Sequence, residues 1–348
     1  MIIITKSLKL ITKNWLLILI LIIASFLRLW KLSNIPPGLT PDEASLGYNA
    51  YSILKTGHDE YGKLLPLIFK SFGDYKPGLY VYLTVPFVAF FGLNEFAVRL
   101  PSAIAGVIAI WLLYKIVLIF FAKQTHQTPN TNHQSLASIT ALLLAISPWH
   151  IHFSRGAWEA NISLTLTLAA IYFFFKSLRG KKYLIYSAAF FSLTLVTYLG
   201  SKLATAVVLG ILVVLFWKKL MTLERRLLAR SVILSLIISL PIILSLFQGK
   251  TGRLEVFSIL TYRRPQEQIQ TIARQGEESI GGLNYSLFHS ESLNLKRSIL
   301  GRWFNHFSTR FLFFEGDWQN PRHSSPNHGM LLLSDLVFLI VGFVMLVR

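Results

Sequence analysis

The sequence predicts an all-α membrane protein, a bundle of about eight transmembrane helices with juxtamembrane helices in its first outer loop. Of the 348 residues, 53% are hydrophobic and only 14% are charged, whereas a soluble domain carries roughly a quarter charged residues. Apolar runs long enough to cross a bilayer recur along the chain. Basic residues cluster in short connections beside these runs, which is the pattern that orients membrane helices. Most of the surface is therefore expected to face lipid.

The expected spans are continuous apolar runs over residues 14–32, 97–121, 135–149, 157–176, 182–199, 202–217, 229–247 and 331–347. Residues 78–92 are also apolar, but they are too few for a hydrocarbon core of about 30 Å and include Pro86. If this run does not cross, the basic clusters face the cytoplasm together, in loops 122–134, 177–182 and 218–230. We therefore expect residues 78–92 to form a juxtamembrane or re-entrant helix within a first outer loop, residues 33–96.

The predicted organisation has three parts. Residues 1–247 form the transmembrane core, residues 248–330 an extracytoplasmic loop region, and residues 331–348 a last transmembrane helix. Because the chain ends directly on that helix, we expect a truncated chain, with a natural terminus as the alternative. A cleaved signal peptide is not expected, because the first apolar run closes on Arg28-Leu29-Trp30-Lys31 instead of small residues.

Composition excludes several classes of function. The chain has no cysteine, which excludes thiolate nucleophiles and Cys-ligated metals. The net charge of +18 does not indicate a nucleic-acid partner, because the basic clusters flank apolar runs and lack interleaved aromatic residues. Of the 16 acidic residues, only Glu224 falls in an expected cytoplasmic loop. Either the outer segments are simply longer and more polar, or chemistry takes place there.

The first candidate site is Thr40-Pro41-Asp42-Glu43-Ala44, which follows the first span. Thr40 is a suitable N-cap and Pro41 a suitable first helical residue, so both carboxylates fall in a first helical turn. They are expected either to complement the helix dipole or to act as a general base. Adjacent carboxylates near headgroups disfavour each other's ionisation, which is one way to tune such a base.

The second candidate is Asp74-Tyr75-Lys76-Pro77. Pro77 forces Lys76 out of the helical region, so its ammonium lies on an extended segment where it can meet an anion. The alternative is a lysine that snorkels to the membrane interface.

The third candidate connects two spans on the outer side, from Pro148 to Asn161. Arg155 and Glu159 are four residues apart and would face the same way if the next helix begins near Ser154. The alternative is a local ion pair within an aromatic interface belt. His150 and His152 do not predict a metal site, because no third ligand lies nearby.

Two further polar segments adjoin apolar runs. Tyr198 and Lys202 lie between two expected spans, where a lysine is costly unless it faces a cavity or a partner charge. The polar segment before the last span is rich in hydrogen-bond donors and could clamp a phosphate or a sugar; it contains Arg322, His323 and His328.

The ordered set of these motifs resembles the C-type membrane glycosyltransferases over about residues 14–217. The nearest groups are in glycosyltransferase family 39: the dolichyl-phosphate-mannose protein mannosyltransferases and the bacterial aminoarabinose transferase of lipid A. The matching motifs are Pro41-Asp42-Glu43-Ala44, Asp74-Tyr75-Lys76-Pro77, Val98-Arg99-Leu100-Pro101-Ser102-Ala103 and Ser154-Arg155…Glu159. The resemblance implies a helix bundle with juxtamembrane helices and more C-terminal helices than this chain has.

The resemblance also implies roles for these residues. Catalytic acids would fall on Asp42, Glu43 and Glu159, although some members have the last acid two places on, where this chain has Asn161. The family's phosphate-facing lysine and second-loop arginine would fall on Lys76 and Arg155. Beyond the resemblance, the polar segments described above offer further candidate contacts to the donor phosphate or sugar: Asp74, Tyr75, Lys202, Tyr198, Arg322, His323 and His328. No metal or other cofactor is expected.

The implied function is transfer of a sugar from a polyprenyl-phosphate donor, with inversion, to a protein, lipid or glycan acceptor. The site would lie on the non-cytoplasmic face of the plasma membrane. A transporter or flippase of a lipid-linked saccharide is the alternative, since it would share the helices and the anion contacts, although transporters often show inverted repeats that this sequence lacks. A non-catalytic scaffold would leave the clustered acids without a use.

Overall fold

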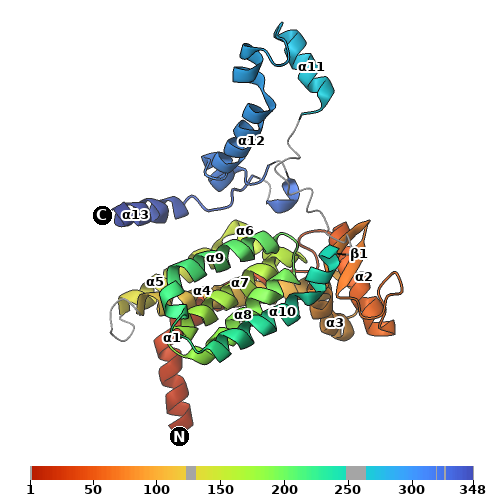
Figure 1. The fold of residues 1–348 in the computed structure, drawn as a ribbon. Coiled ribbons are helices and arrows are strands. Elements are labelled where there is room, and N and C mark those ends of the chain that lie inside the picture. Colours follow the sequence, from red (N-terminus) through yellow and green to blue (C-terminus); the bar gives the residue numbers. More distant parts are fainter. Residues whose placement is uncertain (1, 123–130, 248–263, 319, 325–326, 348) are drawn as a thin grey trace. The chain divides into compact units, whose positions relative to one another are not determined.

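The computed structural model describes residues 2–122, 131–247, 264–318, 320–324 and 327–347 (Figure 1). The chain separates into two compact units, one formed by Met1–Gly252 with Phe338–Arg348 and the other by Arg253–Val337. The predicted division into residues 1–247, 248–330 and 331–348 stays a prediction. The membrane side of each part stays a prediction.

The first unit is built mainly from helices, with one hairpin near its start. In chain order its elements are α1 (Ile2–Leu29), α2 (Pro41–Thr56), β1 (Ile68–Ser71), β2 (Asp74–Pro77), α3 (Leu79–Phe91), α4 (Glu95–Ala122), α5 (Thr131–Ile146), α6 (Pro148–Ser154), α7 (Glu159–Ser177), α8 (Leu184–Leu195), α9 (Ser201–Leu220) and α10 (Arg225–Phe247). In Figure 1, α4, α7, α8, α9 and α10 lie side by side, with α2, α3 and the hairpin at one end. The hairpin corrects the all-α prediction.

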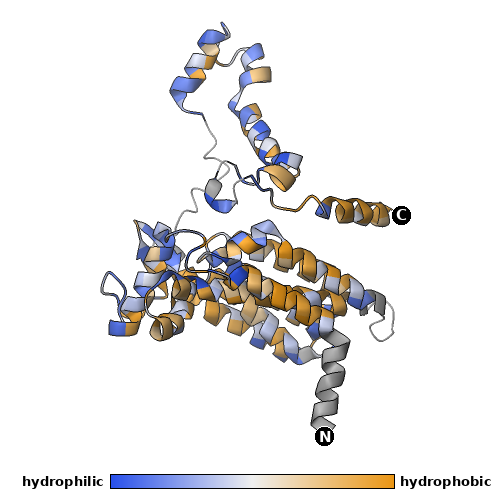
Figure 2. Ribbon diagram, turned by 180° about the vertical axis from the view of Figure 1, so that it is seen from behind, coloured by the Kyte–Doolittle hydropathy of each residue, from blue (hydrophilic) through white to orange (hydrophobic). Residues whose placement is uncertain are grey.

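The helices make this an integral membrane protein. Four of the described helices are long and apolar enough to cross a membrane, over Glu95–Phe121, Glu159–Ser177, Ser201–Leu220 and Arg225–Ser245, and Figure 2 shows how hydrophobic this bundle is. A fifth span is added if α5 and α6 count as one helix bent by 61°. The bend follows from Pro148, which cannot continue α5 and instead begins α6. The predicted count of about eight spans is not confirmed, because three of the expected runs form shorter apolar helices, over Trp15–Leu29, Leu184–Leu195 and Asp335–Val347.

The hairpin β1–β2 shapes the first loop. Its strands are antiparallel and pair Phe69 with Lys76. The two turn residues, Phe72 and Gly73, have φ of 48° and 81°, as a two-residue turn of the twist-matched type requires. The expected extended conformation of Lys76 is confirmed. Helix α3 has 13 residues, which makes it about 20 Å long at 1.5 Å per residue, shorter than a hydrocarbon core of about 30 Å. That α3 does not cross the membrane stays a prediction.

Two of the buried hydrophobic clusters of this unit pack the first loop and α1 onto the bundle. One packs the first loop onto the bundle, through Leu46 and Ala50 of α2, Phe69 of β1, Tyr80 of α3 and Val98 of α4. The other is rich in alanines and packs α1, α4 and α5, through Ala24, Ile110, Ala137, Ala141 and Ala145. Small residues let membrane helices approach closely, which compensates for the missing hydrophobic drive in lipid.

The second unit contains α11 (Gln266–Gln275), a π-helical turn (Tyr285–His289), α12 (Glu291–Asn305), a second π-helical turn (Arg310–Phe314) and a short 3₁₀ turn (Pro321–His323). Arg264 joins the start of this unit to α12 by an ion pair with Glu291, at 2.6 Å. The apolar helix α13 (Asp335–Val347) follows.

Candidate active site

The first turn of α2 fixes two adjacent carboxylates. Thr40 is the N-cap: its hydroxyl accepts from the backbone N–H of Glu43 at 3.3 Å, and its own N–H donates to the Glu43 carboxylate at 2.9 Å. This reciprocal pair is a capping box, and Pro41 occupies the first helical position, as the sequence predicts. Asp42 and Glu43 are therefore rigidly presented, one after the other, in the first turn.

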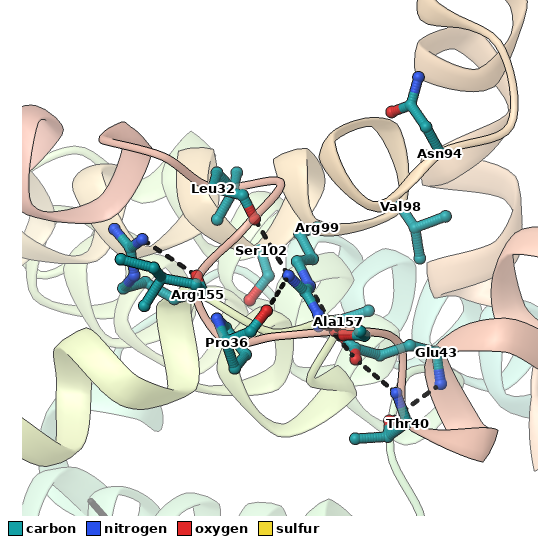
Figure 3. A network of polar contacts seen from close by, with 12 residues as sticks. Leu32, Pro36, Thr40, Glu43, Asn94, Val98, Arg99, Ser102, Arg155 and Ala157 are labelled. Atoms are coloured by element: carbon teal, nitrogen blue, oxygen red, sulfur yellow. Dashed lines mark hydrogen bonds and ion pairs between the residues drawn. The ribbon is translucent and has the colours of Figure 1, made fainter.

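Glu43 faces inward and is held by Arg99 of α4 (Figure 3). Arg99 Nε donates to Glu43 Oε1 at 2.9 Å, and the two side chains are 0% and 5% exposed. The N–H of Ala157 also donates to Oε1, at 2.9 Å. Burial by itself would raise the pKa of Glu43, but the hydrogen bonds from Arg99, Thr40 and Ala157 outweigh it, so the pKa lies below its usual range. Glu43 is thus a buried structural anion, which does not suit the catalytic role predicted for it.

Arg99 also organises the segment between α1 and α2. Its guanidinium donates to the carbonyls of Leu32 at 3.0 Å, Pro36 at 2.8 Å and Gly38 (Figure 3). Arg99 belongs to the motif Val98-Arg99-Leu100-Pro101-Ser102-Ala103, for which the sequence predicted no role. The available signal was a charged residue near the start of an apolar span, which is costly without a partner.

Asp42 points the other way and forms an ion pair with Lys76 of β2. Asp42 is 41% exposed and Lys76 17%. The pair borders a narrow cleft between α2, the hairpin and α3, with a volume of about 10 Å³, close to that of one water molecule. The cleft is lined by Asp42, Ser45, Leu46, Asn49, Phe69, Ser71, Lys76, Pro77 and Val81. The structure therefore brings together the first acid and the lysine predicted from separate motifs.

Glu159 approaches the same pair from the bundle. It is the first residue of α7, and its Oε1 is buried without a hydrogen-bond partner among the described residues. Its carboxylate interacts electrostatically with Lys76, Asp42 and Asp74. A buried carboxylate oxygen without a donor is unusual, and this one can still accept a hydrogen bond.

Asp74, Tyr75 and Tyr198 complete the surroundings. Asp74 accepts from the backbone N–H of Tyr75 at 2.8 Å, within the hairpin. The loop that carries Tyr198 is linked to α3 through the Val196 carbonyl, which accepts from the N–H of Leu79 at 3.4 Å. Burial raises the pKa of Tyr198, and the negative charge of Glu159 raises it further. Tyr198 therefore lies within electrostatic reach of the same cluster.

Arg155 lies elsewhere than predicted. Helix α7 begins only at Glu159, so Arg155 and Glu159 do not share a helix face, and that prediction is wrong. The guanidinium of Arg155 instead donates to backbone carbonyls in the last turn of α1 and just after it, at 2.7 Å to Leu27, 2.6 Å to Trp30 and 3.0 Å to Ile35. Helix α6 begins at Pro148 and ends at Ser154, so residues 155–158 form a turn before α7. The sequence pattern alone did not reveal this turn.

The four remaining predicted donor residues belong to α9 and to the second unit. Lys202 is half-buried near the start of α9 and has no carboxylate at ion-pair distance among the described residues. In the second unit, His323 contacts Asp317 at 3.0 Å, and Arg322 and His328 are exposed. A part for these four residues in donor binding stays a prediction.

The described residues contain no group of three His, Cys, Asp or Glu side chains that could hold a metal ion. His150 instead contacts Arg28 of α1, at 2.8 Å from Nδ1 to the guanidinium. Arg28 is fully buried and also donates to the carbonyl of Ala145 at 3.0 Å and the hydroxyl of Ser154 at 3.3 Å. This second buried arginine, which sequence reasoning treated only as the end of an apolar run, ties α1 to α5 and α6.

Comparisons with known proteins agree with this architecture. Residues 75–245 match the family described as dolichyl-phosphate-mannose-protein mannosyltransferase. Two crystal structures of ArnT from Cupriavidus metallidurans are similar to this chain. The apo structure has 16% sequence identity and a TM-score of 0.51. The structure bound to undecaprenyl phosphate has 17% sequence identity and a TM-score of 0.50. Each comparison covers 69% of this chain and 43% of ArnT, so the chain spans less than half of that protein's length. No curated protein sequence matches the chain.

The match to the mannosyltransferase family and the ArnT-like fold together confirm the resemblance to C-type membrane glycosyltransferases that the motifs indicated. The matched stretch begins at Tyr75, inside the hairpin, and includes Lys76, Arg99 and Glu159. Asp42 and Glu43 precede it, and their roles rest on the geometry described above.

Proposed function

We propose that this protein is an inverting glycosyltransferase that moves a sugar from a polyprenyl-phosphate donor to an acceptor nucleophile. The observation that carries the proposal is the ion pair between Asp42 and Lys76, with the unpartnered Oε1 of Glu159 beside it, at one end of a membrane bundle. A base and a cation side by side are what displacement of a phosphate at an anomeric carbon requires. The family match and the undecaprenyl phosphate bound to ArnT support a lipid-linked donor.

Asp42 is the proposed general base. It is the more exposed of the two adjacent carboxylates, and its ion pair holds it beside Lys76, the cation proposed to contact the phosphate. In the reaction the acceptor O–H or N–H bond breaks and its proton passes to Asp42. The acceptor then bonds to the anomeric carbon from the face opposite the phosphate, which gives inversion, as in the inverting glycosidases.

Lys76 is the proposed phosphate contact. Its ammonium balances Asp42 in the absence of donor, and a donor phosphate would take up part of that interaction. When the bond between the anomeric carbon and the phosphate oxygen breaks, negative charge grows on the phosphate, and a nearby ammonium stabilises it. We assign Arg155 to support of the loop, because its recorded partners are backbone carbonyls.

Glu159 is the proposed sugar contact. An unpartnered buried carboxylate oxygen is suited to accept a hydrogen bond from a sugar hydroxyl, which would satisfy an acceptor that is otherwise costly to bury. Glu43 is left out of the chemistry because its carboxylate is already bonded. We place this site on the non-cytoplasmic face, since the basic loops lie at the other ends of the helices and orient toward the cytoplasm by the positive-inside rule.

The test is incubation of the purified protein in detergent with polyprenyl-phosphate donors that carry radiolabelled sugars, followed by loss of label from the lipid. Wild-type protein should release sugar to an added acceptor or to water. Asp42→Asn should reduce turnover by about 10²–10⁴-fold, which is typical for loss of a general base. Glu224→Gln is the matched control. It is an acid-to-amide change in the connection between α9 and α10, and it should leave turnover unchanged.

Turnover of Asp42→Asn within threefold of wild type would remove Asp42 from the mechanism. Donor that binds but is never cleaved, with any sugar or acceptor offered, would instead favour the transporter or flippase that the sequence left open. Detergent separates the two functions, because it leaves no membrane to transport across.

A further inference from the structure

A second cavity lies at the end of the bundle away from Asp42, where α4 and α7 end and α9 approaches its last turn. Its volume is about 290 Å³, and its walls are Ile119, Phe120, Phe175, Leu178, Arg179, Phe216 and Lys219. Five of these side chains are apolar and two are cationic. The cavity shares no residue with the proposed active site, and the proposed transfer reaction does not use it.

Helix α9 is kinked near its end, at one of the residues that line the cavity. Phe216 leaves helical geometry, with φ of −112° and ψ of 16°, and its ring turns toward α7. It meets Phe175 edge-on at 5.7 Å between ring centroids, and Phe175 meets Phe120 at 5.8 Å. These rings form a rigid aromatic wall. A space with such walls suits hydrocarbon and is unfavourable for a polar solute.

Two cations stand beside this apolar space. The guanidinium of Arg179 is exposed and is oriented by one hydrogen bond, 3.1 Å, to the carbonyl of Ile119. Lys219 is exposed in the last turn of α9. Cations at helix C-termini are favourable for the helix dipole alone, so their charge does not by itself indicate a ligand. Their position on the rim of a preformed apolar cavity is the additional observation.

The surrounding charge is almost entirely positive. Between residues 176 and 230 the sequence has a single acid, Glu224, and ten basic residues. One of the ten, Lys202, is in the first turn of α9, and the other nine are Lys176, Arg179, Lys181, Lys182, Lys218, Lys219, Arg225, Arg226 and Arg230. Basic pockets between membrane helices bind anionic lipid headgroups, while their apolar walls receive part of an acyl chain. A volume near 300 Å³ is at the lower end for small ligands, so it fits part of one chain and not a whole lipid.

We propose that this cavity binds an anionic phospholipid of the bilayer, with its phosphate at Arg179 and Lys219 and an acyl segment against Phe120, Phe175 and Phe216. The lipid would join the ends of α4, α7 and α9, which otherwise leave this space between them. The site is separate from donor binding, so the proposal stands or falls independently of the transferase activity.

The test is binding of pyrene-labelled phosphatidylglycerol to the purified protein in detergent, followed by fluorescence transfer from tryptophan. Phosphatidylcholine with the same label is the neutral probe and should bind roughly tenfold more weakly. Lys219→Gln should weaken phosphatidylglycerol binding roughly fivefold, since one cation near an anionic headgroup contributes about that factor, and Lys219→Arg should restore it. Lys218→Gln is the matched control, the same change one residue earlier and outside the cavity.

Leu178→Phe enlarges a wall of the apolar space without changing charge or adding a tryptophan donor, and should weaken both labelled lipids, while the protein still elutes as a single species by size exclusion. Millimolar inorganic phosphate should not displace phosphatidylglycerol, because the acyl contact is missing. Equal binding of both lipids, or equal loss in Lys218→Gln and Lys219→Gln, would overturn the proposal. Displacement of phosphatidylglycerol by an equal concentration of polyprenyl phosphate would also overturn it, by assigning the cavity to the carrier.

Discussion

The buried ion pair between Arg99 and Glu43 offers the sharpest test of the structural reasoning. Arg99→Met keeps most of the side-chain volume and removes the charge. It leaves the Glu43 carboxylate buried without its cation, and the carbonyls of Leu32, Pro36 and Gly38 without their donor. We expect a large loss of stability, because an uncompensated buried charge is among the costliest defects in a protein.

The size of the stability loss in Arg99→Met follows from the burial of the ion pair. Both side chains are 5% exposed or less, so solvent screening does not reduce the effect. Loss of one partner from a buried pair costs about 3–5 kcal/mol. At about 2–4 °C per kcal/mol for a unit of some 250 residues, the midpoint of thermal unfolding should fall by about 6–20 °C.

The assay is thermal unfolding in detergent at a fixed heating rate, followed by the fraction that remains monodisperse, since membrane proteins commonly unfold irreversibly. The double variant Arg99→Met with Glu43→Gln should be more stable than Arg99→Met alone, because it removes the stranded charge. Arg310→Gln, in the exposed pair with Glu315 of the second unit, is the control and should not change the midpoint. A midpoint for Arg99→Met within 2 °C of wild type, or a double variant as unstable as the sum of its parts, would refute the reasoning.

Three further predictions follow from the same coordinates. Gly106→Ala should lower the thermal midpoint, because a Cβ there meets a side chain of α6, whereas Gly210→Ala, with open space around it, should not. The lowered pKa of Glu43 adds stability that is present above its unfolded pKa and is lost as pH falls through the lower folded pKa; the midpoint should therefore fall in acid below about pH 4, and Glu43→Gln should show a smaller fall. In this cysteine-free chain, Phe72→Cys and Leu93→Cys place thiols at exposed positions before and after α3. Both should react with an impermeant reagent in intact cells, and reaction of the first alone would mean that α3 crosses the membrane.

Local sequence rules predicted the elements that depend on neighbouring residues. Thr40 and Pro41 fixed the start of α2, and Pro77 kept Lys76 extended, as the structure confirms. The hairpin was missed because its strands have only four residues each, too few for a periodic pattern. The turn pair Phe72-Gly73 was the available signal.

Contacts between distant segments were not predictable in this way. Glu43 and Arg99 are 56 residues apart, and nothing in either motif indicates that they meet. The spacing of Arg155 and Glu159 even pointed to a false contact, because it assumed one continuous helix where the chain has a turn. The predicted count of about eight spans is not confirmed for a similar reason, since an apolar run such as 182–199 forms only the 12-residue helix α8.

The adjacent carboxylates of α2 show why motif and role have to be separated. Successive residues on a helix point about 100° apart, so one acid faces the bundle and its neighbour faces the hairpin. Glu43 meets Arg99 and is buried, whereas Asp42 meets Lys76 and remains accessible. If this division is correct, the same acid-to-amide change should have opposite signatures one residue apart. Asp42→Asn should lose sugar transfer and keep its thermal midpoint, while Glu43→Gln should lower the midpoint, and the protein that remains folded should retain its transfer rate per molecule.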